Sequence, residues 1–154
     1  MAQERIRVVA TNRNAKRDYI LGETYEAGIA LQGTEIKSVR AGQVSLNEAF
    51  VLIDKNLEAW LVDAYIAPYE RASRGNHDPR RKRKLLLHKK EILRLWNQVR
   101  EKGMTIVPVR MYIKNGRAKV EIALAKGKKK YDKRRELARK EAEREIQRYL
   151  FRRR

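Results

Sequence analysis

Residues 105–125, TIVPVRMYIKNGRAKVEIALA, decide the fold of this chain of 154 residues. Two runs of alternating apolar residues flank Asn115-Gly116, a pair favoured in type I′ turns because both residues tolerate positive φ. The pattern predicts an antiparallel hairpin with one buried face. We expect the inward side chains of the two strands to be Val107, Val109, Met111 and Ile113, then Ala118, Val120, Ile122 and Leu124.

Upstream of the hairpin, the same alternation predicts further strands. In TYEAGIAL, residues 24–31, apolar and polar side chains alternate with the period of a half-buried strand. Residues 48–67 read as two strands joined by the turn residues Asp54-Lys55-Asn56. Residues 73–84, SRGNHDPRRKRK, are rich in glycine, proline and charge, so we predict an exposed loop there.

Two helices are predicted between these strands. In QGTEIKSVRAG, residues 32–42, Thr34 is the expected N-cap of a short helix. In HKKEILRLWNQVREKG, residues 88–103, His88 and Glu91 have the spacing of a capping box, and apolar residues recur at helical spacing. The glycine that closes each of these segments is a C-terminal stop signal.

The order of these elements indicates the fold class. Several short antiparallel strands with two or three helices indicate a mainly β protein with added α. An oligonucleotide-binding-type antiparallel β-barrel is the leading expectation, while another small α+β sheet stays open on composition alone. We predict a flexible basic arm over residues 1–16, the barrel domain over residues 17–125 and a basic C-terminal tail over residues 126–154.

The charge of the chain is high and uneven. Lys and Arg number 38 against 19 Asp and Glu, which gives a net charge of +19. Residues 126–154 hold 14 basic and 5 acidic side chains, so nearly half of the excess charge lies in the last fifth of the chain. Such a balance predicts a polyanion, a membrane or a ribosome-like surface as the partner.

The tail has a pattern beyond its charge. Tyr131 stands among lysines, where an aromatic ring can stack on an exposed base while the lysines hold phosphates. Helix formers dominate residues 132–150, so we expect the tail to be disordered when free and helical when bound. A solvated charge run, with Tyr131 packed on the barrel, and a membrane-surface helix stay open as alternatives.

Several kinds of site are not indicated by the sequence. The chain has no cysteine, which excludes disulfides, zinc ribbons and thiol nucleophiles. The two histidines, His77 and His88, have no second ligand at metal-site spacing, and no catalytic motif occurs. We therefore expect no catalytic residue, no metal and no cofactor. We see no signal peptide or apolar run long enough to span a membrane, and we expect a cytoplasmic protein.

Four stretches taken together match a known family. They are residues 12–42, NRNAKRDYILGETYEAGIALQGTEIKSVRAG, residues 66–70, IAPYE, residues 78–91, DPRRKRKLLLHKKE, and residues 125–134, AKGKKKYDKR. In this order they resemble the SmpB family of SsrA-binding proteins, which partner transfer-messenger RNA in bacterial trans-translation. The resemblance implies an oligonucleotide-binding-type barrel that binds the tRNA-like domain of this RNA and escorts it to stalled ribosomes.

The resemblance also implies two sets of contact residues. On one face of the barrel, the elbow of the tRNA-like domain would be held by Asn12, Arg13, Glu26, Arg83, Lys84, Leu86 and His88. Many relatives carry asparagine where this chain has His88, and both residues can cap a helix and hydrogen-bond RNA. In the decoding centre and the vacant messenger channel of the small ribosomal subunit, the tail would fold into a helix and make contacts through Gly127, Lys128, Lys129, Tyr131, Asp132, Lys133 and Arg134.

Two other functions compete with this adaptor role. A general basic ribosome-associated or nucleic-acid-coating protein would choose little between RNAs and would lose affinity steeply with salt. Neutralising about six phosphates gives a log–log slope of about −4 on single strands. An RNA-processing enzyme would need a metal or a general base. The adaptor role implies transfer-messenger RNA and the ribosome as partners of a monomer, and no membrane.

Overall fold

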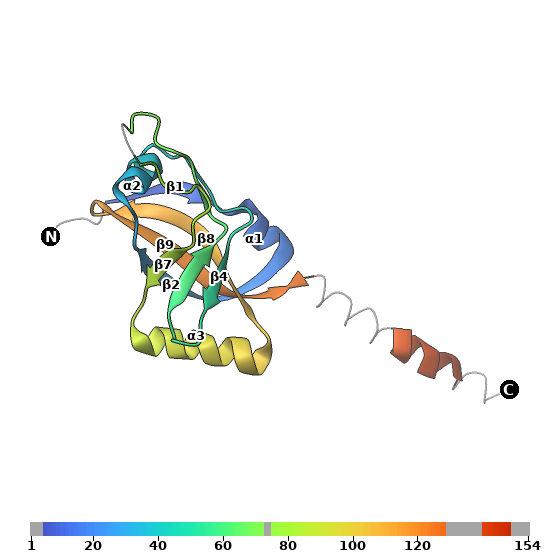
Figure 1. Cartoon of the computed structure of the whole chain (residues 1–154). Coiled ribbons are helices and arrows are strands. Elements are labelled where there is room, and N and C mark those ends of the chain that lie inside the picture. Colours follow the sequence, from blue (N-terminus) through green and yellow to red (C-terminus); the bar gives the residue numbers. More distant parts are fainter. Residues whose placement is uncertain (1–4, 73–74, 129–139, 149–154) are drawn as a thin grey trace.

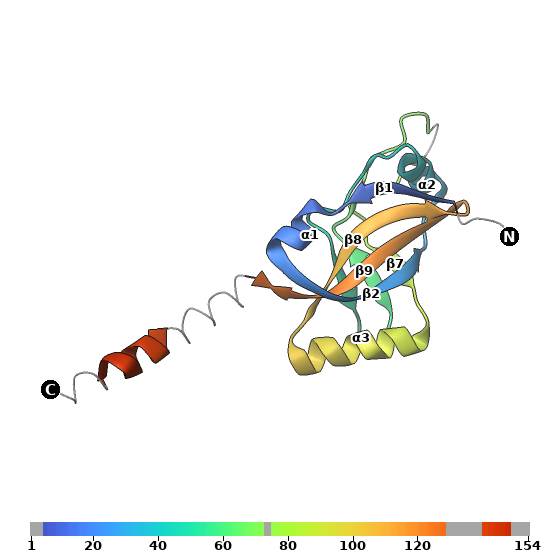
Figure 2. The ribbon, with the colours of Figure 1, turned by 180° about the vertical axis from the view of Figure 1, so that it is seen from behind.

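A computed structural model of the chain describes residues 5–72, 75–128 and 140–148. Its elements in chain order are β1 (Ile6–Thr11), α1 (Arg13–Asp18), β2 (Tyr19–Ile29), α2 (Gly33–Arg40), β3 (Val44–Ser45), β4 (Phe50–Ile53), β5 (Ala59–Val62), β6 (Tyr65–Ile66), β7 (Arg83–Leu86), α3 (Lys89–Lys102), β8 (Thr105–Lys114) and β9 (Arg117–Gly127). Residues 140–148 are also helical. Figure 1 and Figure 2 show the chain from opposite sides.

Six of the strands close into a barrel. Strands β8, β4, β5, β7, β2 and β9 pair in that order, and β9 pairs back to β8. Every pairing is antiparallel, and the seam between β4 and β8 is a single residue pair, Val51 with Ile106. β1 pairs with β8 outside this ring, and β3 and β6 form a separate two-stranded sheet. The predicted antiparallel barrel is confirmed.

The predicted hairpin is present, with one change of phase. Asn115 and Gly116 have φ of 50° and 82°, as a type I′ turn requires. A bulge at Val109 shifts the register between β8 and β9, and beyond it the alternation changes face. Val107 therefore packs outside the main core, and Val109 is only half-buried. The prediction that these two valines point into the barrel was wrong, and Ile106 takes the inward position.

The barrel interior forms the main core. Its buried side chains come from every strand of the ring, and Leu61, Leu85, Met111 and Ile122 are among the most enclosed of the large ones. α3 lies across one end of the barrel (Figure 1), where Ile92 and Leu95 are buried and Trp96 and Val99 pack partly buried against the core. This end of the barrel is therefore closed by an amphipathic helix, as the spacing predicted.

The predicted flexible arm over residues 1–16 is largely built into the fold. Ile6–Thr11 forms β1, which pairs with β8, and α1 begins at Arg13. A register shift between Val8 and Ala10 disturbs the alternation of β1, and Ile6 and Val8 are about half-exposed. The sequence pattern of an edge strand with a bulge is weak for this reason, so the stretch resembled a polar arm.

The predicted exposed loop over residues 73–84 is partly wrong. Its last two residues begin β7, a strand between β5 and β2 in the barrel wall. His77 is buried, with Nδ1 2.9 Å from Thr34 Oγ1 and Nε2 2.9 Å from the Ile66 carbonyl oxygen. Thr34 thus contacts His77, and the N-cap of α2 is Gln32. The many charged residues of this stretch made it look exposed, because charged residues are rarely buried. The start of β7 and the burial of His77 were therefore not predicted.

The barrel also extends beyond the predicted boundary at residue 125. β9 runs to Gly127, and Tyr19 and Ile20 of β2 pair with Gly127 and Lys126. None of the helices in residues 5–72, 75–128 and 140–148 combines the length and apolar character needed to cross a membrane.

Candidate nucleic-acid interface

A surface pocket of about 550 Å³ opens where β2, β7 and β9 meet the start of α3. The residues that line it are Glu26, Gly28, Leu57, Glu58, Lys84, Leu85, Leu86, Leu87, His88, Glu91, Ile92 and Lys119. Four of the seven barrel residues expected to contact RNA are among them, namely Glu26, Lys84, Leu86 and His88. The chain segments that carry these residues lie about 60 positions apart, and the pairing of β2 with β7 brings them together.

Register explains the floor of the pocket. Gly28 of β2 is directly opposite Leu86 of β7, and it is also opposite Lys119 of β9. Because glycine has no side chain, Leu86 lies over this position, and 54% of Leu86 is exposed to solvent. An exposed leucine of this size is an apolar surface that a flat ring can contact. Leu86 therefore shapes the floor of the pocket.

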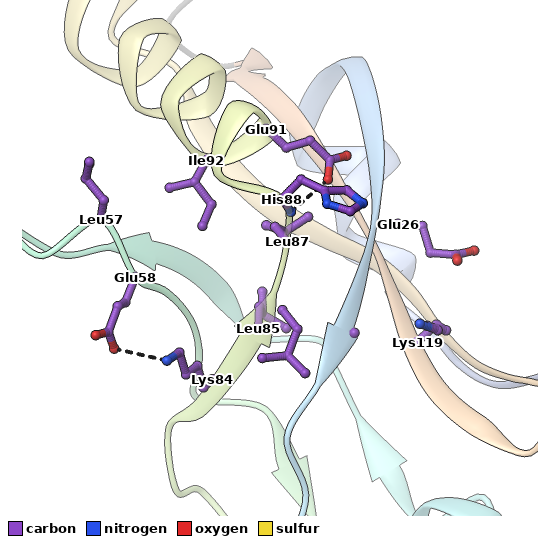
Figure 3. A pocket seen from close by; sticks show the side chains of 12 residues that line it. Glu26, Leu57, Glu58, Lys84, Leu85, Leu87, His88, Glu91, Ile92 and Lys119 are labelled. Atoms are coloured by element: carbon purple, nitrogen blue, oxygen red, sulfur yellow. Dashed lines mark hydrogen bonds and ion pairs between the residues drawn. The ribbon is translucent and has the colours of Figure 1, made fainter.

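His88 lies at the rim of the pocket as the N-cap of α3. Its backbone N–H donates to the Glu91 carboxylate over 3.1 Å, which is the capping-box bond that the sequence predicts. Figure 3 shows the imidazole of His88 beside Glu91, and the ion pair between Lys84 and Glu58, 3.6 Å long, at another side of the pocket. The helix cap thus holds the backbone of His88 while its ring stays exposed.

Glu26 is the carboxylate that β2 presents on this face of a strongly basic protein. Tyr112 of β8 donates a hydrogen bond to its Oε2, and Lys114 Nζ lies 3.4 Å from both carboxylate oxygens. The Tyr112 bond lowers the pKa of Glu26, burial opposes it, and Lys114 and Lys119 lower the pKa further, to below its ordinary value. Glu26 is therefore ionised at neutral pH, with 39% of its side chain exposed.

Arg83 does not belong to this surface. Its side chain is fully buried, and its Nε donates to Glu35 Oε2 over 2.5 Å. Its other nitrogens donate to the carbonyl oxygens of Ala64, at 2.7 Å, and Pro79, at 3.1 Å. The expected contact between Arg83 and RNA is contradicted by this burial. The residue instead ties the start of β7 to α2 and so fixes the strand that carries the pocket.

Glu35 of α2 binds two arginines and so forms an ion network with them. Arg81 also donates to Glu35, over 2.5 Å, and the Gln32 backbone N–H donates to it over 2.8 Å. Burial raises the pKa of Glu35, but the hydrogen bonds from Arg81, Gln32 and Arg83 outweigh it, so the pKa lies below its ordinary value. The carboxylate is therefore charged in the folded protein and neutralises the buried guanidinium of Arg83.

Asn12 and Arg13 do not line the pocket. Asn12 is buried, its Nδ2 donates to the Pro108 carbonyl over 2.8 Å, and its Oδ1 accepts from the Asn14 backbone N–H over 3.2 Å. Asn12 thus caps α1 and secures the bulge of β8, which is a structural role. Arg13 is exposed on α1.

Sequence reasoning missed two residues that the structure adds to the site. Lys119 lines the pocket from β9, and Tyr112 of β8 holds Glu26. Both lie more than 85 positions from Glu26 in the sequence, and only the pairing of β2, β9 and β8 brings them to it. The signal available in the sequence was the outward phase of the predicted hairpin, whose polar positions include Lys119.

Two of the seven expected tail contacts lie in the described part of the chain. Gly127 ends β9, and Lys128 Nζ donates to the Lys16 carbonyl oxygen over 2.7 Å. The remaining expected contacts, Lys129, Tyr131, Asp132, Lys133 and Arg134, lie outside the described residues. Within residues 5–72, 75–128 and 140–148, no three His, Cys, Asp or Glu side chains gather as a metal site would need.

Comparisons with known proteins agree with this architecture. The family profile described as SmpB protein matches residues 9–152. The SsrA-binding protein of Desulforudis audaxviator is 55% identical over 148 residues, 96% of each chain, and that of a Sulfurihydrogenibium species is 60% identical over 141 residues, 92% of each.

A solved structure gives the same result for the fold. A chain in the structure described as "tmRNA-SmpB: a journey to the center of the bacterial ribosome" has a TM-score of 0.64 and 53% identity, and the match covers 76% of this chain and 82% of that one. With the barrel and these matches in agreement, the chain belongs to the SmpB family.

Proposed function

We propose that this protein binds the tRNA-like domain of transfer-messenger RNA and delivers it to stalled ribosomes for trans-translation. The barrel pocket contacts the RNA through Glu26, Lys84, Leu86 and His88, with Lys119 as an added contact. The tail residues that match the family signature contact the small ribosomal subunit. The chain acts as a monomeric adaptor in the cytoplasm, where ribosomes are, and performs no chemical step itself.

The observation that carries this proposal is the position of Glu26. A protein of net charge +19 that bound RNA by charge alone would gain nothing from an ionised carboxylate in its binding pocket. A carboxylate there repels phosphate, yet it accepts hydrogen bonds from the N–H and O–H groups of bases and sugars. The pocket therefore favours selective contact with exposed bases or riboses over general coating of RNA.

The test is the substitution Glu26→Gln, measured by titration of the full chain with a tRNA-like domain and with tRNA as competitor at moderate salt. We expect the selectivity for the tRNA-like domain to fall about tenfold or more, because each hydrogen bond to a charged group contributes about 1.5–3 kcal/mol. If binding depended on charge alone, Glu26→Gln would instead raise the affinity for RNA, since one negative charge that repels phosphate is removed.

The matched control is Glu23→Gln. Glu23 lies on the same strand and contacts Arg94 and Tyr25, outside the pocket. Both variants replace one glutamate by glutamine, so they have equal net charge. We expect Glu23→Gln to keep its selectivity. If both variants bind every RNA more tightly and alike, the chain is a basic coating protein and the adaptor function is wrong.

A second prediction concerns the pocket floor. A Cβ added at Gly28 would lie 3.2 Å from the Leu86 Cβ, so Gly28→Ala is expected to displace Leu86. Overpacking of this kind costs about 1–3 kcal/mol of stability, and we expect affinity for the tRNA-like domain to fall about tenfold. Urea unfolding and RNA titration measure the two effects.

Gly22→Ala is the control for this variant. It lies on the same strand, where an added Cβ would meet the Leu124 carbonyl oxygen at 3.5 Å, an ordinary contact. We expect it to change stability by about 0.5 kcal/mol or less and to leave RNA binding unchanged. Equal loss of RNA affinity in both variants would show that the floor formed by Gly28 and Leu86 has no part in binding.

A further inference from the structure

The orientation of the Glu26 carboxylate is set by the barrel wall. Tyr112 is 3% exposed, and its hydroxyl donates to Glu26 Oε2. The Arg110 guanidinium lies 5.1 Å from the centre of the Tyr112 ring and pairs with Glu121 over 2.5 Å. The tyrosine that donates to Glu26 is therefore itself contacted by Arg110, whose position is fixed by Glu121.

These contacts leave part of the carboxylate available. An ionised carboxylate has about four acceptor positions. Tyr112 takes one, and Lys114 Nζ, 3.4 Å from both oxygens, shares a long contact between them. About two positions therefore remain on a side chain that is 39% exposed and lines the pocket.

The neighbours of Glu26 define what a ligand must look like. Lys119 supplies a hydrogen-bond donor, and Figure 3 shows it on the same side of the pocket as Glu26, whose pKa its charge lowers. Leu86 supplies an apolar surface, 54% exposed. A matching ligand has a flat apolar face and an edge that carries donors beside an acceptor.

We propose that the pocket takes an unpaired guanine base of the bound RNA, with Tyr112 as a positioning residue for Glu26. Guanine N1–H and N2–H donate to the Glu26 carboxylate, and O6 accepts from Lys119. The inference rests on the proposed function, since it names the chemistry that the tRNA-like domain presents to this pocket.

Guanine fits because of the order of groups along its Watson–Crick edge. It is the one standard base with two adjacent donors, N1–H and N2–H, followed by an acceptor. Adenine and cytosine offer one amino group next to a ring nitrogen whose lone pair would face the second carboxylate oxygen. Uracil offers one N–H between two carbonyl oxygens. The edge is free only where the base is unpaired, as in loops.

The experiment replaces guanosine by inosine, which lacks the N2 amino group and keeps N1–H and O6. Each unpaired guanosine of a tRNA-like domain is changed singly, and each RNA is titrated with the full chain. We expect one position at which inosine weakens binding about tenfold, the loss of one hydrogen bond to a charged group. With Glu26→Gln that penalty is expected to vanish.

Tyr112→Phe tests the positioning role, because it removes only the hydroxyl group. We expect it to weaken binding of the guanosine RNA about fivefold and to reduce the inosine penalty at the same position. Tyr25→Phe, which removes a hydroxyl bonded to Glu23 over 3.0 Å, is the matched control and is expected to keep both values. Thermal unfolding of each variant checks that the barrel is intact.

Two outcomes separate this inference from the proposed function. If no inosine position depends on Glu26 while Glu26→Gln still loses selectivity, the guanine assignment is wrong and the adaptor function stands. If removal of a ribose 2′-hydroxyl, and not of a guanine amino group, weakens binding in a way that depends on Glu26, then Glu26 contacts a sugar. If the full chain shows no preference for the tRNA-like domain over tRNA, the proposed function fails first.

Discussion

A chain that ends at Lys128 is expected to bind the tRNA-like domain nearly as well as the full chain and to lose all peptide tagging on stalled ribosomes. Gly127 pairs with Tyr19, and Lys128 donates to the Lys16 carbonyl, so the barrel remains complete in this variant. The removed segment, residues 129–154, carries 12 basic and 5 acidic residues and most of the expected ribosome contacts.

Two measurements on this variant distinguish the function of the barrel pocket from that of the C-terminal tail. At moderate salt we expect affinity for the tRNA-like domain within about threefold of the full chain, or about 0.7 kcal/mol. Tagging in a reconstituted translation reaction is expected to fall to the level seen without the protein. A cut at residue 125 would be a poorer test, because it also removes the strand pairs made by Lys126 and Gly127.

The control for the truncation is a full-length chain with residues 129–154 in scrambled order. Its composition and charge are those of the natural protein, so bulk electrostatic attraction is preserved. We expect tagging to stay lost in the scrambled chain. Recovery of tagging would show that charge alone is sufficient, and loss of RNA affinity on truncation would show that the barrel pocket is not the specific site.

The substitution Glu35→Ala is expected to cost about 3–5 kcal/mol of unfolding free energy, which is the usual result of removing one partner of a buried ion pair. The Arg83 guanidinium is fully buried and would keep its charge without a counter-ion. Arg81, with 32% of its side chain exposed, can turn to water, so Arg83 dominates the cost. Urea unfolding measures the change.

A control and a rescue sharpen this prediction. Glu48→Ala breaks an exposed pair with Arg80, 3.4 Å long, and is expected to change stability by less than about 1 kcal/mol. The double variant Glu35→Leu, Arg83→Leu removes both buried charges and is expected to recover much of the loss, since apolar replacements of buried pairs are often neutral. A loss under about 1 kcal/mol in Glu35→Ala would contradict the assigned role.

The ion pair between Glu35 and Arg83 is also expected to make the stability of the protein depend on pH. The pKa of Glu35 is lower in the folded protein than in the unfolded chain, so its contribution is full above the unfolded value, about 4.3, and is lost as the pH falls through the folded value. The difference in unfolding free energy between wild type and Glu35→Ala is therefore expected to shrink on acidification. Unfolding curves from pH 7 to pH 3 test it.

Local signals in the sequence were sufficient for the elements whose causes are local. Asn115-Gly116 makes its turn through the φ values of two adjacent residues. His88, Glu91 and Gly103 start and end α3 through contacts within a few residues. The barrel class followed because the alternation of apolar residues predicts strands and their buried faces. Resemblance to the family supplied Glu26, Lys84, Leu86 and His88, and the structure places these four in one pocket.

Tertiary structure decided whatever depends on partners far away in the chain. Arg83 looked like a surface cation because its counter-ion, Glu35 of α2, lies 48 positions earlier, and only the tertiary fold brings the two together. The bulge at Val109 reversed the faces of β8 through its register with β9 and the contact of Asn12 with Pro108. Lys119 and Tyr112 reach Glu26 because antiparallel pairing sets them across neighbouring strands. Side-chain type and spacing determine which strands form, whereas register determines which side chains meet, and register is a property of the closed barrel.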